Sequence, residues 1–412
     1  MTAAIANQRR SPQRIIRAPQ REVEALLGGV LLKTLGKAAQ NIALTKSGLV
    51  AKEAYLPQCG YTMYYHEREA VIDADHVSND QVERNQPTIL FFHGLSMRSE
   101  ELAGFIASLD IPPRIRILCP EQMGHGRDVD NRLRADPDNY TLPTHNLMLE
   151  TTSEFLDVVK CSSNTNAFGI SLGGAVCYYI QHHRPDIIKR AVLVSPAILC
   201  CVDKDLLLGI QQRTNNFCSF ESRQDVKVLM RDLSTGRDDD TRKKRDPVPK
   251  FLLESVYRQS KKKAPEGHFR ALLLHLMSNA GLTQSAYATT FSHQSLVAKG
   301  SLMIDSSIQI DEIDINPFTA VKDVDAESHR LVIWPEKDRI INYEAGKRFF
   351  EVSSSGSSKD GGLVSRNANT EFEAIADCGH VFRSDGKVIF DIIQPRVREY
   401  LVNFGGESVN NI

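Results

Sequence analysis

The sequence lacks the patterns that mark a metal-binding or a disulfide-rich protein. Its cysteines form no C-x-x-C pair and no cluster with histidine, so no zinc site and no other cofactor is predicted. Several lie in apolar runs such as RILC and AILCC, which favours buried free thiols in a reducing compartment. The eight cysteines are Cys59, Cys119, Cys161, Cys177, Cys200, Cys201, Cys218 and Cys378.

The chain also lacks an excess of charge of either sign. Lys and Arg number 50 against 51 Asp and Glu, which gives a formal net charge of −1. No basic stripe is interleaved with aromatic residues, so binding to nucleic acid is not expected.

Long apolar runs are missing from the start of the sequence. The longest one there, ALLGGVLL at 25–32, is far shorter than the roughly 20 residues that a membrane-spanning helix needs. No apolar segment with a small-residue cleavage site follows the early arginines, so no secretory signal is predicted. We therefore expect a protein inside the cell, with membrane association or an organelle left open.

Residues 1–50 are expected to form a separate N-terminal region. Residues 1–21 contain five arginines and no acid, which fits a disordered tail, a transit peptide or an arm that contacts a membrane surface. Apolar residues then recur at helical spacing from Val23 to Ile42. This stripe predicts an amphipathic helix that either lies in a membrane interface or packs on the rest of the protein.

From residue 51 onward, short apolar runs alternate with helical patterns. GYTMYY (60–65) and AVID (70–73) indicate two antiparallel strands. The alternation predicts an α/β fold with a mostly parallel, doubly wound sheet. Further strands are expected at 88–92, 114–119, 166–170, 191–195, 331–334 and 372–376, with helices at 145–160, 173–183 and 388–404.

One connection is much longer than a crossover between parallel strands requires. Residues 197–327 contain helical patterns such as FLLESVYRQS (251–260) and FRALLLHLMSNAG (269–281). A structureless loop of this length is rare in a compact domain, so we expect a helical cap inserted into a core formed by 51–196 and 328–412. A second, shorter insertion, SSSGSSKDGG at 353–362, has the composition of a flexible loop.

A candidate nucleophile follows the strand predicted at 166–170. Gly169-Ile170-Ser171-Leu172-Gly173 matches G-x-S-x-G, the pattern of a serine on a sharp strand-to-helix turn. The pattern alone is common by chance, but here a predicted strand precedes it and a predicted helix follows it. This context places the Ser171 hydroxyl at the carboxyl edge of the sheet, near a helix N-terminus that favours developing negative charge.

A serine hydroxyl is a weak nucleophile without a base, and the base needs an acid to orient it. His380, in DCGH after the last predicted strand, is the expected base, and Asp338, in WPEKD after the strand before it, is the expected acid. The order serine, acid, histidine accompanies this type of serine turn. Glu336, and further along the chain Asp203 or Asp205, are alternatives for the acid.

The oxyanion hole of such a site consists of two backbone N–H groups. One is expected from Leu172, directly after the nucleophile, and the other from Leu95, in the turn after the strand at 88–92. His93 is expected to hold that turn through side-chain hydrogen bonds. Gly124-His125-Gly126 lacks the lysine of a phosphate-binding loop, so it is interpreted as a turn.

These motifs, in this order, resemble those of the α/β-hydrolase fold: HGLS (93–96), GHGRD (124–128), GISLGG (169–174), WPEKD (334–338) and DCGH (377–380). With YTMYYHER (61–68) they are most similar to the monoacylglycerol-lipase-like branch that carries an N-terminal membrane anchor. The resemblance covers residues 55–200 and 328–404 and implies the same roles for Ser171, Asp338, His380, Leu95 and Leu172. The chain departs from the family at Glu121, where many members have Asp, at Pro335, where the family has glycine, and in its long insertion.

The resemblance implies a serine hydrolase that cleaves carboxylic esters through an acyl-enzyme, acting on a lipid or another long acyl ester. The insertion would then cover the acyl pocket as a lid. Three alternatives stay open. The same triad serves amidases and peptidases, His380 and Asp385 have the H-x4-D spacing of acyltransferase-like relatives, and some relatives of this fold act as receptors or scaffolds without catalysis.

Overall fold

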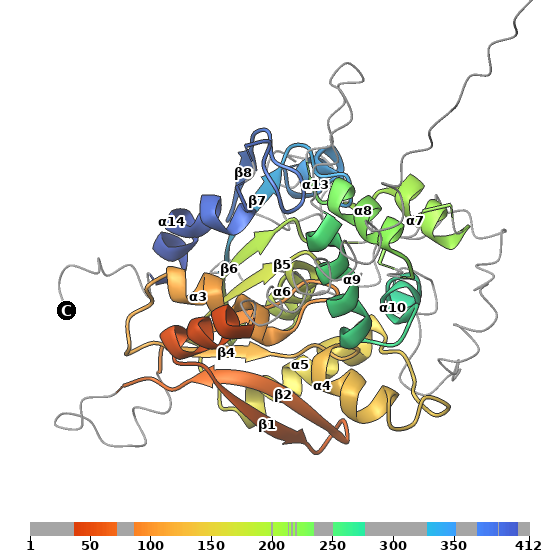
Figure 1. Cartoon of the computed structure of the whole chain (residues 1–412). Helices are drawn as coiled ribbons and strands as arrows, with labels where there is room; N and C mark the ends of the chain where they lie inside the picture. Colours follow the sequence, from red (N-terminus) through yellow and green to blue (C-terminus); the bar gives the residue numbers. More distant parts are fainter. Residues whose placement is uncertain are drawn as a thin grey trace, which may run out of the picture.

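A computed structural model describes residues 37–71, 86–198, 201–212, 214–215, 217–218, 221–234, 250–276, 328–351, 369–385 and 387–402. Within these residues, eight strands form one sheet in the order β1-β2-β4-β3-β5-β6-β7-β8 (Figure 1). Strands β3 to β8 are parallel, and β1 and β2 are joined to them through the antiparallel pair of β2 with β4. The α/β-hydrolase fold expected from the sequence is confirmed.

The predicted parallel strands lie where their apolar runs placed them, with ends that differ by at most three residues. The strands are β1 (Val50–Leu56), β2 (Tyr61–Arg68), β3 (Thr88–Phe92), β4 (Arg116–Pro120), β5 (Thr165–Ile170), β6 (Ile188–Val194), β7 (His329–Pro335) and β8 (Thr370–Ile375).

One predicted strand pair is wrong. β2 pairs with β1, which precedes it in the sequence, and not with the strand predicted at 70–73. Ala70 and Val71 belong to no strand, and residues 72–73 lie outside the described part of the chain. The sequence of β1, VAKEAYL, carries Lys52 and Glu53 and is largely exposed, as an edge strand can be. The sequence does not predict this strand, because its polar residues interrupt the apolar run that marks a buried strand.

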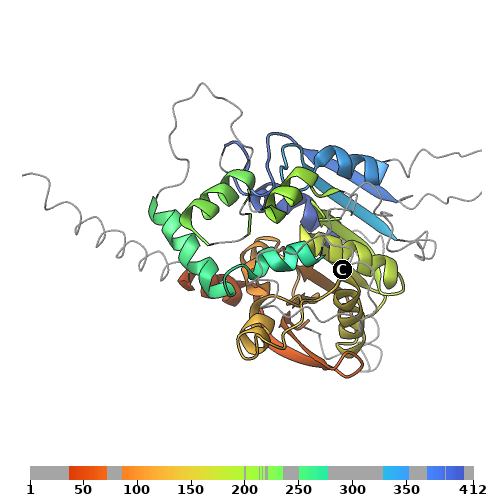
Figure 2. The same cartoon turned by 90° about the vertical axis from the view of Figure 1, so that its right-hand side faces the viewer.

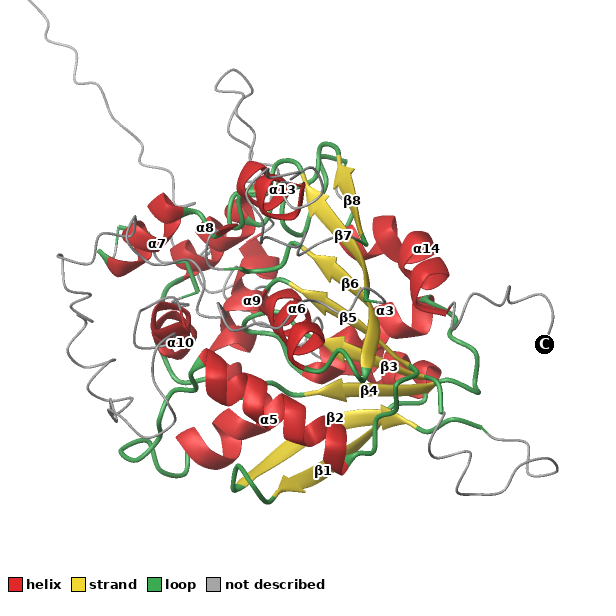
Figure 3. Ribbon diagram, turned by 180° about the vertical axis from the view of Figure 1, so that it is seen from behind, coloured by secondary structure: helices red, strands yellow, loops and turns green. Residues whose placement is uncertain are grey.

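Helices cover both faces of the sheet (Figure 3). Alternate residues of β3 show why both faces are apolar: Ile89 and Phe91 join a buried cluster with α3 and α14, whereas Leu90 and Phe92 join one with α5, α6 and α13. The helices of the core are α3 (Ala103–Ser108), α4 (Gly126–Asp128), α5 (His145–Val158), α6 (Leu172–His183), α13 (Tyr343–Glu351) and α14 (Ile389–Val402), with the short turns η1 (Ser99–Leu102) and η2 (Val129–Leu133).

The described part of the long connection between β6 and β7 is helical. The arrowheads of β5 and β6 point toward the helices of this connection, so these helices lie at the carboxyl edge of the sheet (Figures 1 and 2). The predicted helix at 251–260 lies within α9; the one at 269–281 coincides with α10 up to residue 276 and then leaves the described residues. The helices are α7 (Lys204–Gln211), α8 (Arg223–Asp232), α9 (Lys250–Lys263) and α10 (His268–Leu276).

The N-terminal helix is described only over residues 37–47. There Ala43 and Leu44 pack against the buried cluster that contains α3, while Ile42 is 55% exposed. This end of the helix therefore contacts the core. Residues 1–36, with the basic tail and most of the predicted stripe, and the predicted loop at 353–362 lie outside the described residues. Among the described helices, none has the length and apolar character needed to cross a membrane.

Candidate active site

Ser171 lies in the turn between β5 and α6 with backbone angles φ 54° and ψ −120°. A residue other than glycine in such a sparsely populated region costs about 1–3 kcal/mol, so the surroundings must hold it. They do so from both sides: the Ser171 N–H donates to the carbonyl of Val194, and the N–H of Ala197 donates to the Ser171 carbonyl, each at 2.9 Å. The side chain consequently faces the cavity at the edge of the sheet.

The glycines around Ser171 are required because the turn is so tight. A Cβ atom on Gly173 would lie 2.3 Å from the carbonyl oxygen of Phe92, and one on Gly169 would lie 2.2 Å from the carbonyl oxygen of Gly173. Helix α6 can begin directly beside β3 and β5 only when these positions have no side chain. The G-x-S-x-G pattern is thus a packing requirement of this turn.

Asp338 and His380 are in direct contact. The Asp338 Oδ2 atom accepts a hydrogen bond from His380 Nδ1 at 2.7 Å, and its Oδ1 atom accepts from the N–H groups of Ile340 and Ile341 at 2.9 and 3.0 Å. The Asp338 carboxylate is fully buried, so these three bonds fix its orientation. With Nδ1 as donor, the other ring nitrogen of His380, Nε2, is left as an acceptor.

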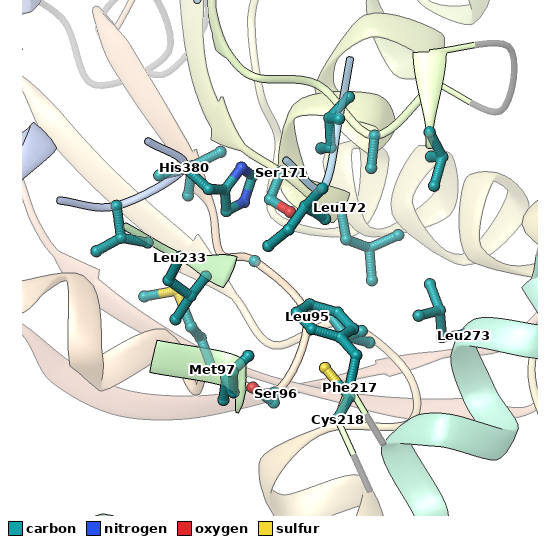
Figure 4. A pocket seen from close by; sticks show the side chains of 18 of the residues that line it. Leu95, Ser96, Met97, Ser171, Leu172, Phe217, Cys218, Leu233, Leu273 and His380 are labelled. Atoms are coloured by element: carbon teal, nitrogen blue, oxygen red, sulfur yellow. The ribbon is translucent and has the colours of Figure 1, made fainter. Parts of the chain in front are cut away.

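Ser171 and His380 line the same cavity, and Figure 4 shows the imidazole beside the serine. No hydrogen bond joins the Ser171 hydroxyl to His380 within the described residues. In proteins without substrate, catalytic hydrogen bonds are often long and shorten only in the complex. The structure thus brings the three predicted residues to one place, with the bond from acid to histidine already formed.

The alternative carboxylates do not contact His380. Glu336 is exposed, although it is only two residues from Asp338. Asp203 caps the start of α7, where its Oδ1 atom accepts from the N–H of Leu206 at 2.8 Å, and Asp205 is exposed. The geometry therefore favours Asp338 as the partner of the histidine.

Asp385, the residue behind the H-x4-D spacing, also points elsewhere. It forms an ion pair with Arg383 at 2.5 Å and leaves 43% of its side chain exposed. The nitrogen of His380 that it would orient is already bonded to Asp338. The spacing gives no support to acyl transfer in this chain.

Both expected oxyanion donors lie at the cavity. Leu172 is the first residue of α6. Leu95 lies in a turn close to Ser171: a Cβ atom added to the neighbouring Gly94 would be 3.5 Å from the Cβ atom of Ser171. Within the described residues, the N–H groups of Leu95 and Leu172 donate to no other group. Two unused donors beside a serine can receive a developing oxyanion.

His93 fixes the turn that carries Leu95 through hydrogen bonds of both its ring nitrogens. The carbonyl of Gly94 accepts from His93 Nδ1 at 3.0 Å and from the N–H of Met97 at 3.2 Å, while His93 Nε2 accepts from the N–H of Gln122 at 3.1 Å. Gly94 C=O and Leu95 N–H belong to one peptide group, so fixing the oxygen also fixes the donor. Burial lowers the pKa of His93 to about 4, which keeps the imidazole in the neutral form that this pattern needs.

The cavity above Ser171 has a volume of about 180 Å³ and an almost entirely apolar lining. Much of that lining comes from the insertion, and Phe217, Cys218 and Leu273 lie across the cavity from His380 (Figure 4). The sequence predicts a pocket built by the apolar stretches FLLESVY (251–257) and ALLLHLM (271–277), and the second of these supplies Leu273, whereas no residue of the first lines the cavity in the part of the chain that the structure describes. Phe217 and Cys218 lie in no predicted helix and were not anticipated. The insertion contributes Val202, Leu206, Phe217, Cys218, Leu229, Leu233, Leu273 and Leu276.

Glu121, one departure from the family pattern, is buried. It directly precedes Gln122, which bonds to His93 next to the turn Gly94–Met97, here called the oxyanion turn. The Glu121 Oε2 atom accepts from the N–H of Arg127 at 3.1 Å, and no described residue forms a hydrogen bond with its Oε1 atom. A Cβ atom on Gly126 would lie 1.7 Å from that oxygen, so the longer acid fits only beside glycine. Burial raises the pKa of Glu121 to about 7.

Glu121→Gln should remove a pH dependence of stability. Because the folded protein favours the neutral carboxyl, the wild type loses stability as pH rises from 4.5 to about 7, while the unfolded carboxyl is already ionised. The glutamine of the variant is neutral at every pH. The unfolding free energy of the variant minus that of the wild type should therefore increase by about 3 kcal/mol between pH 4.5 and about 7. Urea unfolding near both ends of the range measures the difference. Glu336→Gln, at an exposed site, should show no such change, and an equal difference at both pH values for Glu121→Gln would contradict the assignment.

Comparison with known proteins agrees with the fold. A family model described as the alpha/beta hydrolase fold matches residues 87–382. No curated protein matches the chain.

Several solved structures share the fold. A protein of Acinetobacter baumannii assigned as a lipase has a TM-score of 0.55 at 15% identity, covering 89% of this chain and 95% of its own. A membrane phospholipase A, described as a bacterial virulence factor, has a TM-score of 0.52 at 13% identity, covering 88% and 90%. An esterase of Exiguobacterium antarcticum has a TM-score of 0.51 at 11% identity, covering 86% and 100%. At such identities the likeness shows the fold alone, whereas the family model spans well over half of the 412 residues. The chain belongs to the α/β-hydrolase fold family.

Proposed function

We propose that this protein is a serine hydrolase that cleaves carboxylic esters, and that its substrates are lipids or other long acyl esters, as in the monoacylglycerol-lipase-like branch. The observation that carries the proposal is the buried Asp338–His380 pair beside Ser171 at one end of an apolar cavity. The solved structures assigned as a lipase, a phospholipase and an esterase agree with it.

In the proposed reaction, the Ser171 hydroxyl attacks the ester carbonyl carbon while His380 Nε2 takes its proton. Asp338 keeps the imidazole in the required tautomer and stabilises the imidazolium. The negative oxygen of the tetrahedral intermediate accepts hydrogen bonds from Leu95 and Leu172. The intermediate collapses, the alcohol leaves with the proton from His380, and water then hydrolyses the acyl-enzyme by the same steps.

The lining of the cavity indicates which part of the substrate binds there. Leucine and phenylalanine side chains gain from contact with methylene groups and offer no partner for a charged or strongly polar group. We infer that the acyl chain occupies this cavity and that the alcohol part lies toward solvent.

The nucleophile can be tested by covalent labelling. A fluorophosphonate probe should label the wild type at Ser171, and Ser171→Ala should not be labelled, because the probe reacts with an activated serine. Peptide mass spectrometry of the labelled protein identifies the site. Labelling of Ser171→Ala at the wild-type rate would show that another residue is the nucleophile.

The two neighbouring carboxylates provide a matched control for the same test. Asp338→Asn should lower kcat by roughly 10⁴-fold, since the histidine would be held in the wrong tautomer. Glu336→Gln, two residues away and exposed, should stay near the wild-type rate. A greater loss in Glu336→Gln than in Asp338→Asn would overturn the assignment of the acid.

The cavity predicts a dependence on acyl-chain length. Values of kcat/KM for esters of one alcohol should rise from acetate to medium or long acyl chains, by about 0.8 kcal/mol for each methylene that becomes fully buried. Leu273→Trp, placed across the cavity from His380, should shorten the preferred chain without abolishing acetate hydrolysis. A flat or falling dependence in the wild type would favour an esterase for small substrates.

We also propose that the N-terminal region brings the enzyme to a membrane surface. The five arginines of residues 1–21 would attract anionic lipid by about 1 kcal/mol each. Full-length protein should therefore float with anionic vesicles and be released by salt, whereas a chain starting at Ala51 should stay in solution. Equal flotation of the two chains would mean that the helix serves only to pack on the core, as its end at Ala43 and Leu44 already does.

A further inference from the structure

The helices of the insertion contact both loops that carry the site, one through a backbone carbonyl and the other through a lysine side chain. The carbonyl of Leu233, at the end of α8, accepts from the N–H groups of Val381 and Phe382 at 2.9 and 3.2 Å. These two residues directly follow His380. The end of α8 is therefore bonded to the loop that holds the base.

The end of α9 is bonded to the oxyanion turn. Lys263, the last residue of α9, donates from Nζ to the carbonyl of Ser96 at 3.0 Å and forms an ion pair with Glu101 at 2.6 Å. Ser96 directly follows the oxyanion donor Leu95 and has a φ of 63°, which is uncommon for a residue other than glycine. The lysine thus bonds to a strained residue of this turn.

Helices α8 and α9 also contact one another directly. Arg223 at the start of α8 pairs with Glu254 of α9, and the hydroxyl of Tyr257 donates to the carbonyl of Glu221 at 3.1 Å. The connection between the base loop and the oxyanion turn therefore runs through packed helices, independent of the segment that joins them along the chain.

We propose that α8 and α9 form a brace across the active site, and that Lys263 is a positioning residue that holds the oxyanion turn in its working conformation. The inference rests on the proposed hydrolase function, because the turn matters for catalysis only if Leu95 receives an oxyanion. It adds to that function a residue of the insertion that acts on the reaction without touching the substrate.

The physical reason lies in the number of bonds that fix the turn. His93 and Met97 hold the carbonyl of Gly94, but only Lys263 holds that of Ser96 within the described residues. Without this bond, the left-handed Ser96 can relax and rotate the peptide groups on either side of it. The Leu95 N–H would then no longer point to the place where the negative charge develops.

A simpler role for Lys263 would be to end α9, since cations favour helix C-termini. Lys261 provides a matched control for that role, because it lies in the same last turn and pairs with the exposed Glu266 at 3.3 Å. Of the two lysines, Lys263 bonds to the carbonyl of Ser96 in the oxyanion turn, whereas Lys261 lies over the ring of Tyr257 and pairs with Glu266.

The experiment compares Lys263→Met, Lys263→Arg and Lys261→Met in the full-length protein. Lys263→Met should lower kcat for a chromogenic ester about 10-fold or more with little change in KM, because an oxyanion donor acts in the transition state and not on the bound ester. Lys263→Arg, which keeps a donor and a charge, should recover part of the loss, and Lys261→Met should match the wild type. Should Lys263→Met not fold, Lys263→Gln carries the same expectation.

Amide hydrogen exchange over residues 93–98 gives a second readout that needs no catalysis. Exchange should be faster in Lys263→Met than in the wild type and unchanged in Lys261→Met. Unchanged exchange in Lys263→Met, or a loss of kcat no larger than that of Lys261→Met, would overturn the positioning role. A wild type that is not labelled at Ser171 would overturn the proposed function, while the exchange result would still decide the role of Lys263.

Discussion

The strained conformation of Ser171 is the constraint on which the rest of the site depends. Its φ of 54° is maintained only while Val194 and Ala197 hold its two backbone groups and while glycine occupies positions 169 and 173. The same turn starts α6, and so it leaves the Leu172 N–H without an acceptor in the helix. One backbone geometry thus turns the Ser171 hydroxyl to the cavity, leaves the N–H of Leu172, at the start of the helix, with no acceptor among the described residues, and brings the loop after β6 against Ser171.

The features that could be predicted from the sequence are those with a local physical cause. Buried parallel strands are short apolar runs, and the residues after their carboxyl ends meet at one edge of the sheet, which is why the sequence predicts that Ser171, Asp338 and His380 lie close together. The edge strand β1 could not be predicted from an apolar run, because a largely exposed strand does not need one. The walls of the cavity were predicted only in part: the apolar stretch at 271–277 includes Leu273, whereas Phe217 lies in no predicted helix. Phe217 lines the same cavity as Ser171 only because the insertion folds over the sheet, and its partners there are distant in sequence.

The insertion has two physical roles that are easily treated as one. Apolar side chains such as Leu229 and Leu276 exclude water from the cavity, which strengthens every electrostatic interaction inside it. Polar groups at the ends of α8 and α9, by contrast, reach the catalytic loops. A lid that only covered an acyl chain would need the apolar contacts alone and could separate freely from the core. The polar contacts at the ends of α8 and α9 instead connect these helices to the loops that they cover.

Leu233 makes contacts of both kinds, apolar ones in the cavity and polar ones to the loop after β8. Its side chain lines the cavity, and its carbonyl accepts from the two residues after His380. A substitution that enlarges or reduces the cavity at this position also shifts the backbone that places the base. If the protein acts as proposed, changes near the end of α8 would alter selectivity and turnover together. Leu273 of α10, which lines the cavity across from His380, would then offer the more independent route to a new specificity.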